Sequence, residues 1–224
     1  MVTHDLAALA AENLAPIFYT PTLIGRPSAW WAHVPFAFWL MSACRPRLFV
    51  ELGTHYGVSY AAFCEANLIE SIGAKCIAVD TWQGDDHVGL YGAQVFDELN
   101  TFNKQRYGTF SKLLRSTFKE ALPAVADGSV DLLHIDGRHA YEDAREDFES
   151  WLPKLSEKAV VLFHGTNVRE PGFGVYKLFE ELSRKYPSFD FLHGCGLGLV
   201  VVGSAPPEAI TRLCSMQDQR EIKL

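Results

Sequence analysis

From Leu48 onward, short apolar runs alternate with longer segments in which apolar residues recur every three or four positions. Apolar runs of this length predict buried strands, and the three-to-four spacing predicts amphipathic helices. Strands that alternate with helices are typical of a parallel sheet covered by helices on both faces. The pattern therefore predicts an α/β protein.

The predicted elements follow one another in a regular order. Strands are expected at residues 48–52, 76–80, 111–116, 130–136 and 160–163, of which the third has the weakest pattern. Helices are expected at residues 57–71, 91–107, 140–155 and 175–182. The helix after the fourth strand places Ala144, Phe148 and Leu152 on one face, with acidic residues between them.

The last two predicted strands are connected differently from the earlier ones. Two further strands, at residues 189–192 and 197–202, are separated only by residues 193–196. A parallel pair needs a crossover of about a dozen residues, so this connection makes an antiparallel hairpin. We expect a Rossmann-like, seven-stranded, mostly parallel sheet with the last strand antiparallel and helices on both faces.

Local composition and the predicted elements divide the chain into three regions. Residues 1–47 are interrupted by prolines and rich in aromatic side chains, and we expect a helical cap on the sheet edge or a lid over the substrate. Residues 48–203 contain the strands and helices of the main domain. Residues 204–224 are expected to form a helix and a polar tail.

Composition limits the kinds of molecule that this protein is expected to bind. The net charge is −7 and no long Lys/Arg run is present, which argues against nucleic acid as the main partner. Five scattered cysteines without C-x-x-C spacing predict neither disulfides nor a zinc site. No apolar run reaches the roughly 18 residues of a membrane helix, and the first residues lack a basic targeting region. We expect a cytoplasmic protein with a small-molecule partner, and the sequence leaves homo-oligomers open.

The segment from Val50 to Tyr60 predicts a small-molecule cradle. An apolar strand containing Glu51 runs into a turn with Gly53 and Gly57, and the turn enters a helix. Glycine lets the backbone approach a ligand closely, and a helix start offers unpaired N–H groups. The spacing matches neither G-x-G-x-x-G nor a Walker motif, so no phosphate-binding fingerprint is met.

A second acid specifies the ligand. Asp80 ends the second strand, 23 positions after Gly57, where a carboxylate can accept hydrogen bonds from ribose hydroxyls. The acid at Glu51 suits a ligand that carries an amino group. A ribose and an ammonium group on one ligand indicate S-adenosylmethionine.

These features together resemble the class I S-adenosylmethionine-dependent methyltransferases. The resemblance rests on residues 50–60, residues 79–85, residues 133–142 and the reversed last strand. It is similar above all to the subfamily found in bacterial polysaccharide and natural-product gene contexts. The resemblance covers roughly residues 46–203 and implies that residues 48–203 form an S-adenosylmethionine-binding methyltransferase domain.

Carried over position by position, the resemblance implies a cofactor site. The methionine part would be framed by Glu51, Gly53, Thr54, Tyr56, Gly57 and Ser59. Asp80 would hold the ribose, and Thr81 and Asp136 would also contact the cofactor. Trp82 would lie near the adenine or the substrate mouth, although a core aromatic is an equal alternative. Ser116 and Thr117 match positions that contact adenine in relatives, and both are also ordinary helix N-caps.

Catalysis is expected at the carboxyl ends of the fourth and fifth strands, where ligands bind in open α/β sheets. Methyl transfer to a hydroxyl needs alignment of the nucleophile and removal of a proton. Asp136 closes the fourth strand, His139 follows it as a candidate general base, and His164 closes the fifth strand. A capping or solvent-facing role is the alternative for His139.

One departure from the family concerns metal. Relatives commonly read His-Asp-Thr where this chain reads His164-Gly165-Thr166, and metal-dependent members use that aspartate with one at the end of the fourth strand. Magnesium prefers several oxygen ligands, and Gly165 removes one of them. We predict no metal site, or at most a weak divalent site if Asp85 or Asp86 contributes.

The resemblance implies O-methylation of a hydroxyl on a sugar or a sugar-containing natural product, with a small molecule or glycan as acceptor. The first alternative is a cofactor-binding pseudoenzyme or accessory module that lost turnover with the acid at position 165. A second alternative, a nicotinamide-dependent oxidoreductase, is opposed by the missing third glycine and by the reversed last strand.

Overall fold

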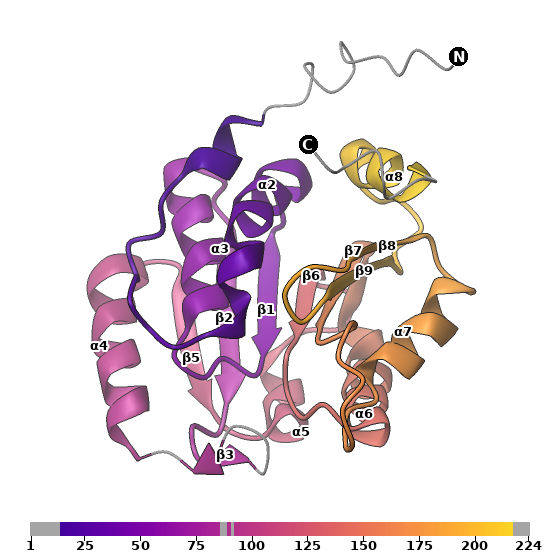
Figure 1. Cartoon of the computed structure of the whole chain (residues 1–224). Helices are drawn as coiled ribbons and strands as arrows, with labels where there is room; N and C mark the ends of the chain where they lie inside the picture. The colour runs from indigo at the N-terminus through magenta and orange to yellow at the C-terminus, as the bar shows by residue number, and fades with distance from the viewer. Residues whose placement is uncertain (1–13, 86–88, 91, 217–224) are drawn as a thin grey trace.

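The computed structural model describes residues 14–85, 89–90 and 92–216. Its centre is a seven-stranded sheet with the order β5-β2-β1-β6-β7-β9-β8 (Figure 1). The strands are β1 Leu48–Leu52, β2 Lys75–Asp80, β5 Ser111–Arg115, β6 Val130–Ile135, β7 Leu155–His164, β8 Ser188–Phe191 and β9 Leu197–Val201. Strand β9 alone runs opposite in direction to the other six strands of this sheet, which confirms the predicted fold.

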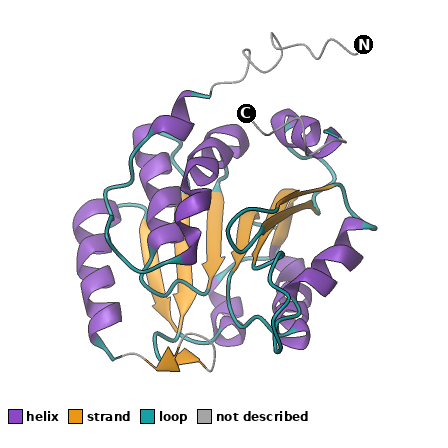
Figure 2. Cartoon of the chain, in the orientation of Figure 1, coloured by secondary structure: helices purple, strands orange, loops and turns teal. Residues whose placement is uncertain are grey.

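Helices cover both faces of this sheet (Figure 2). One face carries α2 Val34–Cys44, α3 Val58–Ile69, α4 Gln94–Tyr107 and α8 Glu208–Ser215. The other carries α5 Phe118–Ala121, α6 Tyr141–Trp151 and α7 Val175–Ser183. Alternate residues of a strand point to opposite faces, so Phe49 joins the first core and Val50 the second.

The N-terminal region belongs to the first of these cores. The short 3-10 helices η1 Ala15–Phe18 and η2 Ala29–His33 precede α2, and α2 packs along α3. Trp30, Phe38 and Leu40 are fully or almost fully buried. Within the described residues, no helix is long and apolar enough to cross a membrane.

Two features were not expected from the sequence. A two-stranded ribbon, β3 Gly84–Asp85 with β4 Gly89–Leu90, lies between β2 and α4. Strand β7 begins at Leu155, five residues before the predicted start, because Val130 of β6 pairs with Leu155 before a register shift. Two 3-10 turns, η3 Leu122–Ala124 and η4 Leu152–Lys154, end α5 and α6 at prolines.

Candidate functional site

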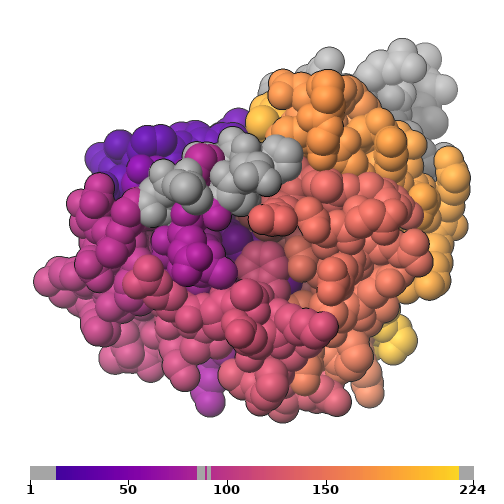
Figure 3. Space-filling view, turned by 90° about the horizontal axis from the view of Figure 1, so that it is seen from below, coloured from indigo at the N-terminus to yellow at the C-terminus, as the bar shows by residue number. Residues whose placement is uncertain are grey.

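The carboxyl ends of the parallel strands meet at one edge of the sheet, and two adjoining cavities open there. Figure 3 views this side and shows a hollow between the magenta and salmon parts of the chain. The first cavity has a volume of about 400 Å³ and reaches Asp80 and Thr117; the second, of about 450 Å³, reaches Ser59 and His164. The lining shared by both cavities is Gly53, Thr54, His55, Asp136 and His139.

The turn after β1 requires glycine at both of its predicted positions. Gly53 has φ +87°, and a Cβ there would lie 2.1 Å from the carbonyl oxygen of Asp136. Gly57 has φ +81°, and its Cβ would lie 2.5 Å from Leu99 Cδ1. Side chains at either position would be strained and would clash. The turn therefore packs directly on the tip of β6 and leaves room for a ligand.

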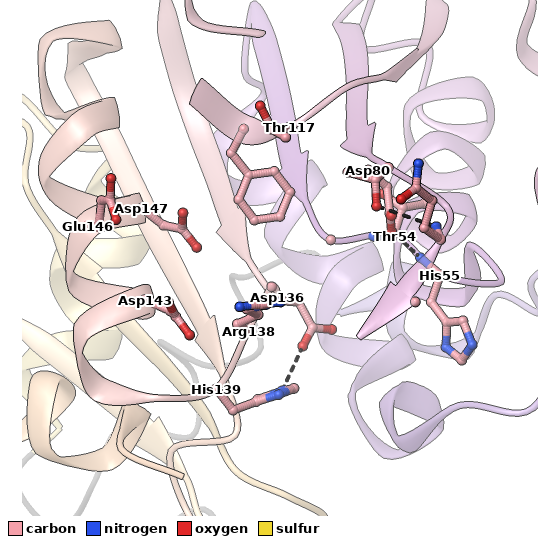
Figure 4. A pocket seen from close by; sticks show the side chains of 16 residues that line it. Thr54, His55, Asp80, Thr117, Asp136, Arg138, His139, Asp143, Glu146 and Asp147 are labelled. Carbon is pink, nitrogen blue, oxygen red and sulfur yellow. Dashed lines mark hydrogen bonds and ion pairs between the residues drawn. The ribbon is translucent and has the colours of Figure 1, made fainter. Parts of the chain in front are cut away.

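Asp80 fixes this turn from the end of β2. Its Oδ2 accepts hydrogen bonds from the backbone N–H groups of Thr54 at 2.8 Å and His55 at 2.9 Å, and its Oδ1 accepts one from the N–H of Trp82 at 2.7 Å. Asp80 also lines the first cavity (Figure 4). Thr81 belongs to the same lining. The carboxylate thus supports the cradle besides facing the ligand space.

The remaining residues expected at the cofactor divide into two groups. Tyr56, Gly57 and Ser59 line the second cavity, and Thr117 lines the first while capping α5 through a capping box with Glu120. Ser116 and Trp82 line neither cavity. Trp82 is 1% exposed, and its indole N–H donates to the carbonyl of His55 at 3.0 Å, so it is a core aromatic.

Glu51 also lies away from both cavities. Its side chain is fully buried, and Oε2 lies 2.8 Å from His134 Nδ1. The indole N–H of Trp30 donates to His134 Nε2 at 3.2 Å, so the neutral ring donates from Nδ1 to Glu51. Burial raises the pKa of Glu51, and the hydrogen bond from His134 opposes that rise. His134 is therefore a core residue whose two ring nitrogens both have hydrogen-bond partners.

The three predicted catalytic side chains meet at the boundary between the cavities. Asp136 Oδ1 lies 3.0 Å from His164 Nδ1 and 3.6 Å from His139 Nε2. Burial raises the pKa of Asp136, but the adjacent imidazoles of His164 and His139 outweigh that effect, and the pKa lies well below its usual range. Asp136 is thus a carboxylate held between two imidazoles.

A magnesium site of the kind found in metal-dependent relatives does not fit these residues. Gly165 supplies no ligand, and the Asn167 amide donates to the carbonyl of Leu192 at 2.7 Å. Asp136 is the only carboxylate of the described residues in the cluster with His139 and His164. Asp86 lies outside the described residues, and the side chain of Asp85 is not described either. A hard cation would find too few oxygen ligands here.

Several cavity residues were missed by sequence reasoning. Asp143, Glu146 and Asp147 of α6 form an acidic wall of the first cavity (Figure 4). Burial, then the charges of Asp143 and Glu146, raises the pKa of Asp147 to about 7. Trp30 and Phe173 line the second cavity. The three-to-four spacing marked these acids only as a polar helix face, because it does not reveal which turn of the helix borders a cavity.

Three solved structures with a similar fold are described as methyltransferases. A putative caffeoyl-CoA O-methyltransferase from Staphylococcus aureus aligns with a TM-score of 0.60 at 14% identity, covering 88% of this chain and 90% of that one. The O-methyltransferase TomG from Streptomyces achromogenes, solved with S-adenosylmethionine, aligns at 0.57 and 16%, covering 91% and 92%. The S-adenosylhomocysteine-bound Podospora anserina methyltransferase PaMTH1 aligns at 0.57 and 14%, covering 90% and 97%. At these identities the likeness concerns the fold.

Sequence comparison gives the family. An uncharacterized protein of Sinorhizobium fredii, y4gI, is 50% identical over 209 residues, which are 93% of this chain but only 22% of that protein. This chain therefore spans about a fifth of the length of that relative. The family model described as a methyltransferase domain matches residues 50–166, from the cradle to the cluster around Asp136. Because that match covers more than half of the chain, this protein belongs to the methyltransferase domain family.

Proposed function

We propose that this protein binds S-adenosylmethionine across the two cavities and transfers its methyl group to a hydroxyl oxygen. The observation that carries the proposal is the convergence of the glycine turn, Asp80 and the Asp136 cluster at one edge of the sheet. This is the edge at which open α/β sheets bind their ligands. Family membership and the S-adenosylmethionine-bound state of a structural neighbour support the same cofactor.

In the proposed binding mode, the adenosine part occupies the first cavity. Gly137 lies against the Phe118 ring, since a Cβ at Gly137 would come 2.5 Å from Phe118 Cε2, and this flat surface suits the adenine. Asp80 and Thr81 face the ribose hydroxyls. The methionine part then follows the Gly53 turn toward Ser59, and the sulfonium methyl points into the second cavity.

The proposed reaction is an in-line displacement. The acceptor hydroxyl gives its proton to His139 Nε2 while its oxygen forms a bond to the methyl carbon, and the carbon–sulfur bond breaks to leave S-adenosylhomocysteine. Asp136 stabilises the imidazolium that forms, because its carboxylate lies 3.6 Å from His139 Nε2. His164 keeps the Asp136 carboxylate in place.

We further propose a sugar or a sugar-containing natural product as the acceptor. The second cavity combines the aromatic side chains of Trp30, Tyr56 and Phe173 with the polar side chains of Ser28 and Glu170. Aromatic faces and hydrogen-bonding groups together suit a sugar ring, which has apolar C–H faces and a rim of hydroxyls. Because the Asp136 cluster lines this cavity, a sugar bound there would place one hydroxyl beside His139.

Calorimetric titration with S-adenosylhomocysteine and with NAD tests the cofactor. We expect S-adenosylhomocysteine to bind and NAD to release no heat. If NAD bound and S-adenosylhomocysteine did not, the proposal would be refuted and an oxidoreductase favoured. Formation of S-adenosylhomocysteine from S-adenosylmethionine with a panel of sugar hydroxyls then tests turnover. Turnover by the unmodified chain would exclude the binding-only alternative, which no observation on the described residues favours.

A further inference from the structure

The Asp136 cluster has the dimensions of a cation site. One ligand atom each from Asp136, His139 and His164 lies within 4.8 Å of the other two. Ligands of a tetrahedral zinc ion with bonds of about 2.0–2.1 Å stand roughly 3.3 Å apart. The two distances to Asp136, 3.0 and 3.6 Å, lie on either side of that spacing. Small side-chain adjustments would place all three atoms on one ion.

Gly165 creates the space for this arrangement. A Cβ at Gly165 would lie 3.2 Å from His139 Cδ2, closer than most Cβ contacts, and the residue has φ +89°. The position that holds a carboxylate in metal-dependent relatives therefore holds nothing, and the imidazole of His139 packs against it.

The donor set decides which cation fits. Two imidazole nitrogens and one carboxylate suit zinc, cobalt and nickel, whereas magnesium prefers oxygen ligands in an octahedral shell. The three side chains line the second cavity, so the remaining coordination positions face open space. The Glu170 carboxylate lines the same cavity and adds negative charge. We propose that Asp136, His139 and His164 bind one divalent cation of the zinc class in preference to magnesium.

A consequence follows for catalysis, and it rests on the proposed function. A cation bound to Nε2 of His139 takes the lone pair that would accept the acceptor proton. Occupation of the site and base catalysis by His139 then exclude each other. Zinc is therefore expected to inhibit methyl transfer, and a chelator is expected to restore it.

Calorimetric titration of the chelator-treated full chain with zinc chloride and with magnesium chloride tests the site. One zinc ion per chain is expected, bound at least about 100-fold more tightly than magnesium. His139→Gln and His164→Gln should each weaken zinc binding at least about tenfold. His193→Gln is the matched control, because His193 is an exposed histidine outside the cluster. It should bind zinc as the unmodified chain does.

Cobalt gives a second readout that does not depend on stability. Tetrahedral cobalt bound to histidine absorbs in the visible range, and this band should appear with the unmodified chain and His193→Gln but not with His139→Gln. Thermal unfolding followed by circular dichroism identifies any variant that fails to fold. Equal zinc affinity in His139→Gln and the unmodified chain, or equal affinity for zinc and magnesium, would overturn the proposal. Because no cofactor is added, these results are independent of the test of S-adenosylhomocysteine binding.

Discussion

His134 of β6 and Glu51 of β1 occupy paired positions on neighbouring strands, and their side chains join across the sheet at 2.8 Å between Nδ1 and Oε2. Both side chains are fully buried, and Trp30 closes the chain of hydrogen bonds from the N-terminal region. Trp30 also lines the second cavity. A buried polar network of this kind connects the stability of the core to the shape of the site.

Replacement of Trp30 tests this connection. Trp30→Phe keeps an aromatic ring but leaves Nε2 of His134 without its donor in a buried place, which should lower the free energy of unfolding by about 1–3 kcal/mol. Trp31→Phe is the control, because the indole of Trp31 donates to the carbonyl of Arg26 in a partly exposed position. Urea denaturation of both variants should show the larger loss for Trp30→Phe. Equal losses would contradict the role given to the network.

The face on which Glu51 lies could have been predicted from the sequence. Successive strand residues alternate between faces, so Glu51 must share the face of Phe49 and turn away from that of Val50 and Leu52. The position of the strand itself, Leu48–Leu52, was predicted to the residue because its apolar run has clear ends. The partner of Glu51 was not predictable, since no local pattern pairs residues 83 positions apart.

The same limit applies to the site. Strand ends placed Asp136, His139 and His164 together, because the carboxyl ends of adjacent parallel strands share an edge. Trp30 enters the second cavity only because η2 folds back over β6, and Asp147 enters the first only because its turn of α6 borders that cavity. Such contacts depend on the packing of helices, which the 3.6-residue period does not specify. The clear predictions were those that sheet geometry alone determines.

Asp80→Ala should weaken binding of S-adenosylhomocysteine by about 1–3 kcal/mol. The mutation removes the expected acceptor for the ribose and also releases the N–H groups of Thr54 and His55. Isothermal titration calorimetry measures the change. Asp127→Ala is the control, since Asp127 pairs with Lys154 at an exposed place and lines neither cavity. Unchanged affinity in Asp80→Ala would refute the assignment of Asp80 to the ribose.

Asp147 should make stability depend on pH. Its pKa of about 7 in the folded protein lies above the unfolded value of 3.8, so the folded state holds the proton more tightly. The stabilisation is complete below the unfolded value and is lost as pH rises through about 7. With about 1.4 kcal/mol per pKa unit, discounted for partial exposure, roughly 2 kcal/mol is expected to disappear between pH 5 and pH 8.

Asp147→Asn isolates this effect, because asparagine does not titrate. Urea denaturation measures the unfolding free energy of both proteins. As pH rises from 5 to 8, the unmodified chain should lose stability relative to the variant. Added salt should reduce the part of the effect that comes from Asp143 and Glu146. A difference that stays constant over this range would show that Asp147 titrates as an ordinary exposed carboxyl.

His139→Gln should lower kcat for methyl transfer by about 10²–10⁴, the usual contribution of a general base. Its affinity for S-adenosylhomocysteine should change little, since the cofactor contacts proposed above come from other residues. Activity is measured with the acceptor found in the sugar panel, and affinity by calorimetry. A large loss of cofactor affinity with unchanged kcat would assign His139 to cofactor binding instead.

Gly165→Ala tests whether the absence of a side chain at position 165 provides the room that the His139 ring occupies. Both Gly165 and Gly25 have φ between +75° and +89°, but a Cβ at Gly25 meets no atom within 4 Å, whereas one at Gly165 meets the His139 ring. Each alanine should therefore cost about 1–2 kcal/mol of stability for the left-handed backbone. Only Gly165→Ala should also displace the imidazole, weakening zinc binding and lowering kcat. If both variants kept full zinc affinity, the clearance at Gly165 would have no part in forming the site.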